Sequence, residues 1–145
     1  MNEIERADAY FENGFSCSQS VFAAFAPQLG LEPETALKIA GPFGGGMGRM
    51  GEVCGAVTGA FMSIGLRHGR VSADDAETKE RAYGLVREFA DRFTQRHGSI
   101  LCRELLGIDM STPEGHEQVQ ESGICATLCP TLVRDAAEIL GEILS

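Results

Sequence analysis

The sequence has little positive charge. Its 145 residues include 12 Lys and Arg against 21 Asp and Glu, which gives a formal net charge of −9 at pH 7. Proteins that bind nucleic acids neutralise phosphates with a surplus of Lys and Arg. We therefore expect no nucleic-acid partner, and the acidity mainly favours solubility.

Long apolar runs are also missing. The first six residues, Met1 to Arg6, lack the basic and apolar regions of a signal peptide, and no later run is long enough to cross a bilayer. We therefore expect a cytoplasmic protein without membrane association. In that compartment, five cysteines are more typical of metal ligands, redox-active thiols or core residues than of a static disulfide framework.

The cysteine spacing lacks the common short motifs. No Cys-x-x-Cys pair is present, which excludes zinc ribbons and common ferredoxin motifs, and no Cys-x-x-Cys-His exists for covalent c-type haem. The closest pair, Cys125 and Cys129, has three residues between its members. A site of four thiolates would therefore have to be assembled by tertiary folding from separate segments.

Helical spacing dominates the apolar pattern, and we find no strand alternation, tandem repeat or domain linker. We predict an all-α, single-domain helical bundle over residues 1–145, with about six or seven helices around a central apolar helix. That central helix is expected at 52–66, where no charge follows Glu52.

Capping residues and prolines predict where the helices begin. Serine followed three residues later by Gln or Glu has capping-box spacing, and proline suits a first helical position. The longest helix is expected to run from a serine cap to about Arg96. The starts predicted from such signals are Ser16, Pro33, Ser72, Ser99, Ser111 and Pro130.

The segment Gly41–Gly51 is too rich in glycine for a core helix or strand, so a loop is expected. Arg49 and the following helix could bind an anion there. However, no Gly-Lys-Ser/Thr follows and no strand precedes, so neither a Walker nor a Rossmann motif is present. We favour a packing role, in which the glycines let the backbone approach closely around Cys54 and leave room for a cofactor or a partner helix.

Three histidines, His68, His97 and His116, are further candidates for metal ligands or a general base. Each lies near a glycine at an expected helix end or loop, so surface or capping roles are the better expectation. His68 stands out because it follows the apolar helix.

Four cysteines fall at predicted helix N-termini: Cys17, Cys54, Cys102 and Cys129. A helix N-terminus carries partial positive charge and free amide donors, which stabilise a thiolate and lower its pKa. The thiolate is the form that attacks disulfides and binds soft metals. The alternative is that these cysteines are small buried hydrophobes.

The stretch Cys54-Gly55-Ala56-Val57-Thr58-Gly59 reads CGAxxG. With Cys17 before it, Cys102 and Cys129 after it, and the glycine-rich approach, it resembles the redox-active protein family named for its C_GCAxxG_C_C signature. The resemblance covers almost the whole chain. It implies an all-helical fold and a functional set of Cys17, Cys54, Cys102 and Cys129. A related domain in a multihaem cytochrome of the split-Soret type has four such cysteines that resemble an iron–sulfur site.

Three interpretations remain open. In the first, these four cysteines hold an iron–sulfur cluster, with 2Fe–2S as the suggested type, for electron transfer or redox sensing. Cys125 is extra and could substitute for Cys129. In the second, the protein is a metal-free thiol–disulfide oxidoreductase with Cys54 as the nucleophile. In the third, the cysteines bind structural zinc. A redox partner protein is expected, and the apolar motif helix makes a homodimer an open alternative.

Overall fold

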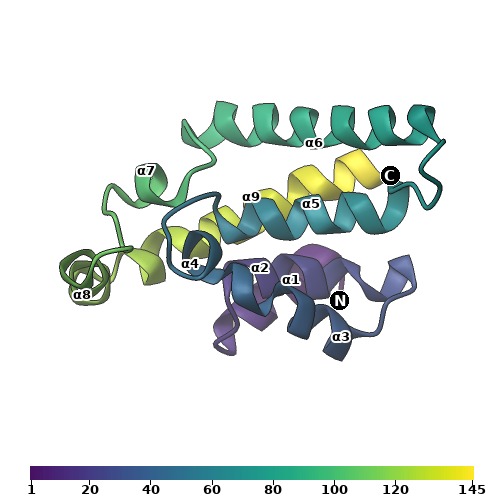
Figure 1. The fold of residues 1–145 in the computed structure, drawn as a ribbon. Coiled ribbons are helices and arrows are strands. Elements are labelled where there is room, and N and C mark those ends of the chain that lie inside the picture. Colours follow the sequence, from purple (N-terminus) through teal and green to yellow (C-terminus); the bar gives the residue numbers. More distant parts are fainter.

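Two helices, α5 (Gly55–His68) and α9 (Ile124–Leu144), form the middle layer of the computed structural model, which describes residues 1–145. The longest helix, α6 (Ala76–His97), covers one side of this layer (Figure 1). The other side is covered by three helices near the N-terminus: α1 (Glu3–Glu12), α2 (Cys17–Phe25) and α3 (Pro33–Ala40).

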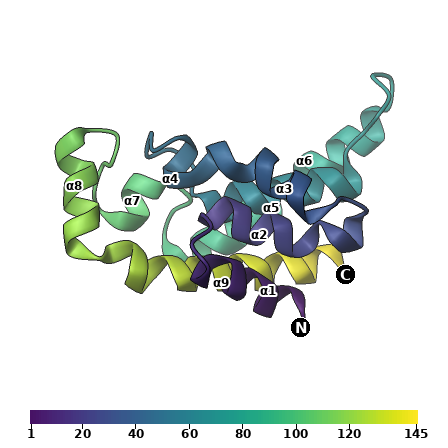
Figure 2. The same ribbon diagram turned by 90° about the horizontal axis from the view of Figure 1, so that it is seen from below.

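Shorter elements gather at one end of the layers, away from both chain termini (Figure 2). They are α4 (Gly44–Met47), α7 (Cys102–Leu106) and α8 (Pro113–Ser122), with a 3₁₀ turn at Gly41–Phe43. A second 3₁₀ turn, Pro27–Leu29, follows α2 and contacts α2 and α5. The chain is 75% helical and has no strand, and eight of its α-helices are longer than the four-residue α4. The all-α prediction is confirmed. No helix combines the length and apolarity that a bilayer crossing requires.

The apolar helix α5 is central, as predicted. Its residues from Gly55 to Ala60 are all buried against α2, α6 and α9. Its two buried hydroxyl groups bond within the helix: Thr58 Oγ1 donates to the Gly55 carbonyl, and Ser63 Oγ donates to the Gly59 carbonyl. Because one chain covers these faces, this helix gives no reason to expect a dimer, and the oligomeric state stays a prediction.

Two glycines of the CGAxxG motif allow α5 to lie directly against α2. A Cβ atom at Gly55 would be 2.8 Å from the Ser18 backbone nitrogen, and one at Gly59 would be 2.8 Å from the Ser18 carbonyl oxygen. Real Cβ atoms do not come this close to backbone, so only glycine fits at either position. The motif therefore encodes helix packing as well as a cysteine.

The C-terminal helix begins earlier than predicted. Pro130 does not open it, because α9 already starts at Ile124 and contains Pro130 in its interior. An interior proline removes one hydrogen bond and costs about 3 kcal/mol. Buried side chains on both sides of it, Cys129 and Leu132 among them, keep the helix continuous. Core packing thus outweighs the local signal.

Three other predicted starts are wrong by one to three residues, whereas those at Ser16 and Pro33 are confirmed. Ser16 forms the predicted capping box with Gln19. Elsewhere a nearby residue occupies the N-cap: Asp75 in place of Ser72, Leu101 in place of Ser99, and Thr112 in place of Ser111. At α6 and α8 several neighbouring polar side chains compete for the same amide groups, so spacing alone does not select one. At α7 the Leu101 N–H donates to Ser99 Oγ, so Ser99 bonds the residue before the helix.

A substitution on α5 tests the helix contact. We expect Gly59→Ala to lower the free energy of unfolding by about 1–3 kcal/mol, because the new methyl group meets the α2 backbone. Gly65→Ala on the same helix is the control, since nothing lies within 4 Å of its Cβ position, and it should raise stability by up to about 1 kcal/mol. Urea unfolding measures both, and equal effects would contradict the packing role.

Candidate cysteine site

All five cysteines line one cavity of about 170 Å³ within a single chain. They come from four helices or their caps: Cys17 from α2, Cys54 from α5, Cys102 from α7, and Cys125 and Cys129 from α9. Apart from Ser16, the rest of the wall is apolar or glycine, and no carboxylate or imidazole lines it. Every one of the cysteines is a free thiol. The structure therefore brings together the whole predicted set, with Cys125 added.

A short antiparallel bridge places Cys54 beside Cys102. Val53 pairs with Leu101, and the two cysteines that follow them each donate a backbone hydrogen bond across the pair. The Cys54 N–H donates to the Ile100 carbonyl at 2.8 Å, and the Cys102 N–H donates to the Glu52 carbonyl at 2.6 Å. This contact, between segments far apart in the sequence, aligns the starts of α5 and α7.

Glycines bring the chain close to two of the cysteines. A Cβ atom at Gly46 would lie 2.7 Å from the Cys102 Cβ, and one at Gly55 would lie 3.3 Å from the Cys17 Cβ. Gly46 also has a φ of 69°, in the left-handed region that favours glycine. The packing role predicted for the glycine segment is supported, although the close approach is to Cys102 and not to Cys54.

The placement predicted for Cys129 is wrong. Cys17 and Cys102 are the first residues of their helices, and Cys54 is the N-cap of α5, but Cys129 lies inside α9. The cysteine in the first turn of α9 is Cys125. Since these two are four residues apart on one helix, they lie on the same face and both reach the cavity.

Burial outweighs the helix N-terminus in the chemistry of Cys54. Desolvation raises its pKa to about 12, while backbone N–H groups of Ala56 and Val57 act in the opposite direction. Burial likewise raises the pKa of Cys102 to about 11, with a further contribution from Cys125. The expectation of low-pKa thiols at the helix starts is therefore wrong for these two residues, which stay protonated near neutral pH.

The two α9 cysteines interact with each other and with α2. The Cys129 thiol raises the pKa of Cys125 far above its usual value, with burial second. Cys125 acts to lower the pKa of Cys129. The Cys17 thiol and burial, taken together, raise this pKa more, so the pKa of Cys129 also lies well above its usual value. Cys129 thus interacts with both Cys17 and Cys125.

The other candidate ligands lie elsewhere. None of the three histidines lines the cavity, and His97 Nε2 bonds Asp135 Oδ2 at 2.9 Å on the packed faces of α6 and α9. No group of three or more Cys, His, Asp or Glu side chains is spaced to hold a metal ion.

Sequence reasoning missed the apolar part of the cavity wall, including Phe11, Leu105 and Met110. Apolar residues of this kind are present throughout the chain, so no sequence signal marked them. The four-residue spacing of Cys125 and Cys129 would have indicated one helix face, but Pro130 moved the expected helix start beyond both.

The fold and the site define a class of protein: a small all-α protein whose cysteines, from four helices, surround one buried cavity. A family model described as "Putative redox-active protein (C_GCAxxG_C_C)" matches residues 15–143. The chain belongs to this family, and the membership supports a redox role. Searches of curated proteins and of solved structures found no match.

The raised pKa of Cys54 predicts a dependence of stability on pH in the metal-free, reduced protein. As pH rises from 9, the unfolded chain releases this proton first, so the unfolded state binds fewer protons and stability falls until about pH 12. Unfolding of wild type and Cys54→Ala should be compared across this range. The stability difference between them should shrink as pH rises, whereas a constant difference would contradict the burial effect.

Proposed function

We propose that the cavity holds an iron–sulfur cluster, bound by Cys17, Cys54, Cys102 and Cys129. The observation that carries this proposal is the convergence of all five cysteines on one cavity with no other ligating side chain in its wall. Thiolate is the ligand that iron–sulfur clusters use in proteins. Such a cluster would supply one-electron transfer, in keeping with the redox role that family membership supports.

The size of the cavity supports a group of several atoms. A single water molecule needs about 10–15 Å³ of such volume, and this cavity has about 170 Å³. A structural zinc ion sits in direct contact with its four ligands and needs no additional space. The cavity volume therefore supports a cluster better than a structural zinc ion.

Backbone amides support a charged sulfur at Cys54. The N–H groups of Ala56 and Val57 interact with this thiol and favour its ionised form. Amide donors directed at a sulfur ligand reduce the cost of buried negative charge and tune the cluster potential. The α5 N-terminus is thus suited to a ligand thiolate, which a metal would create by displacing the proton.

The metal-free thiol–disulfide mechanism has less support from the geometry. Cys54 is only 5% exposed, and its pKa is raised to about 12. A nucleophilic thiol must be ionised and accessible to its disulfide target. Buried, protonated Cys54 meets neither condition. Cys125 on α9 is more exposed than Cys54, but the Cys129 thiol raises the pKa of Cys125 far above its usual value. A Cys125–Cys129 pair therefore meets the accessibility condition better than Cys54 does, but not the ionisation condition.

The proposed cluster also predicts the compartment and the kind of partner. We expect a reducing compartment, the cytoplasm, because free thiols and oxygen-sensitive clusters persist there. We also expect a redox partner protein, since a buried cluster exchanges electrons with another carrier.

Anaerobic purification of the full chain tests the cluster. We expect iron and acid-labile sulfide in matching amounts, together with visible absorption. Serine variants of Cys17, Cys54, Cys102 and Cys129 should each lose most of the iron, because one of four ligands is removed. Cys125→Ser is the matched control, since it removes a thiol from the same cavity and should keep the iron.

Three results would change the proposal. Neither iron nor sulfide in the anaerobic protein, with thiols that oxidise in pairs, would favour disulfide chemistry. Zinc in place of iron would favour the structural site. Loss of iron in Cys125→Ser with retention in Cys129→Ser would exchange the roles of these two residues.

A further inference from the structure

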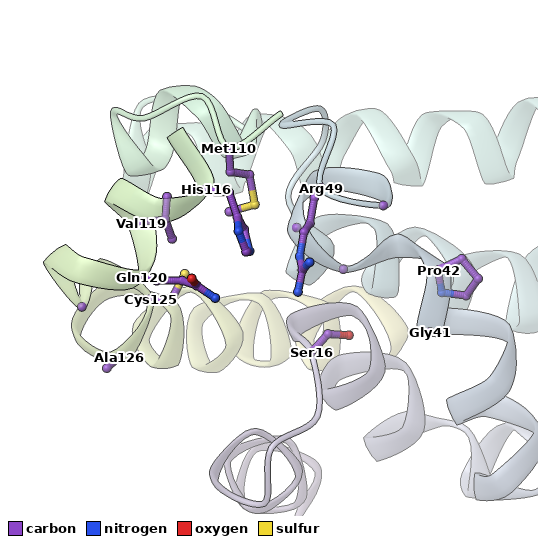
Figure 3. A pocket seen from close by; sticks show the side chains of 14 residues that line it. Ser16, Gly41, Pro42, Arg49, Met110, His116, Val119, Gln120, Cys125 and Ala126 are labelled. Atoms are coloured by element: carbon purple, nitrogen blue, oxygen red, sulfur yellow. The ribbon is translucent and has the colours of Figure 1, made fainter. Parts of the chain in front are cut away.

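A second, larger cleft of about 740 Å³ lies outside the cysteine cavity. It runs between the glycine segment around α4 and the facing helices α8 and α9 (Figure 3). Four residues line both the cleft and the cavity: Ser16, Gly45, Met110 and Cys125. The cleft is therefore the open approach to the cysteine site.

The lining of this cleft contains no carboxylate, although the chain has 21 Asp and Glu and a net charge of −9. It contains instead one cation, Arg49, with His116 and Gln120 as further hydrogen-bond donors. Figure 3 shows Arg49 and His116 pointing into the same space from opposite sides, one from the glycine segment and one from α8. The lining of the cleft thus carries one positive charge and no negative one, although the protein as a whole is acidic.

Arg49, which lines the cleft, has no partner, and neither do three arginines elsewhere in the chain, Arg67, Arg81 and Arg87. Five others form ion pairs with carboxylates: Arg6, Arg92, Arg96, Arg103 and Arg134. No ion pair or side-chain hydrogen bond involves the Arg49 guanidinium. Its backbone has a φ of 65°, and its N–H donates to the Gly44 carbonyl at 3.1 Å. This left-handed conformation costs about 1–2 kcal/mol for a residue with a Cβ, and Met47 in the same segment also adopts it, with a φ of 67°.

We propose that this cleft binds a small molecule through an oxyanion group, a carboxylate or a phosphate, held by Arg49 and His116. The planar guanidinium matches two oxygens of either group, and a histidine ring N–H can donate from the opposite wall. The rest of the bound molecule lies along Met110 and Cys125, the wall shared with the cysteine cavity. This inference goes beyond the proposed function and holds for any metal content of the cavity.

Calorimetric titration of the full chain, reduced and purified without oxygen, tests the proposal with two probes. Inorganic phosphate represents a phosphate group and succinate represents a carboxylate. The probe that binds with the lower dissociation constant identifies which of the two groups the cleft prefers. Saturable binding is expected for at least one. Histidine-ring NMR locates the site, because the His116 signals should shift on addition of the probe while those of His68 and His97 stay in place.

Charge-matched variants separate a specific site from general attraction. Arg49→Gln should weaken binding about tenfold, the loss expected for a charge-assisted contact. Arg87→Gln removes the same charge from an exposed arginine on α6 that also has no ion pair, and it should leave affinity unchanged. His116→Gln should also weaken binding, and His68→Gln should not.

Two results would overturn the proposal: absence of saturable binding for both probes, or equal loss of affinity in Arg49→Gln and Arg87→Gln. Iron and sulfide analysis on the same samples keeps this outcome separate from the proposed function. Protein that binds phosphate but contains no iron would reject the cluster alone, and iron-loaded protein that binds neither probe would reject the anion site alone.

Discussion

The close contact between α2 and α5 is the constraint on which the site depends. It is possible only because Gly55 and Gly59 have no Cβ to meet the Ser18 backbone. The same contact puts the start of α5 against the start of α2, so that Cys54 and Cys17 reach one cavity. The α5 helix then packs on α9 and α6, and the Val53–Leu101 bridge adds α7.

Burial determines the chemical state of Cys54 and Cys102. Helix N-termini stabilise negative charge on sulfur, but their effect is smaller than the desolvation cost inside a cavity walled mainly by apolar groups and glycine. Cys54 and Cys102 are therefore thiols in the metal-free protein near neutral pH. A metal centre would supply the positive charge that makes several buried thiolates acceptable, which links metal binding to proton release.

The cavity and the cleft beside it differ in the side chains that line them. The inner cavity has five thiols in an otherwise almost wholly apolar or glycine lining without a carboxylate, whereas the outer cleft has hydrogen-bond donors and one cation without an ion pair. Met110 and Cys125 belong to both walls. A molecule in the cleft would thus lie next to the cysteine site while its charged group stayed with Arg49.

Local patterns in the sequence determined much of the fold. Apolar periodicity predicted the all-α class and the buried α5, and capping chemistry predicted the starts at Ser16 and Pro33, because these signals act within one helical turn. The cysteine order, through the family resemblance, predicted Cys17, Cys54, Cys102 and Cys129 as the functional set, and all four line one cavity. Only the tertiary structure decided that α9 continues through Pro130, that Cys125 joins the cavity, and that burial raises the pKa of Cys54. Each of these depends on contacts between segments far apart in the chain, and their energies exceed the local preferences that a sequence displays.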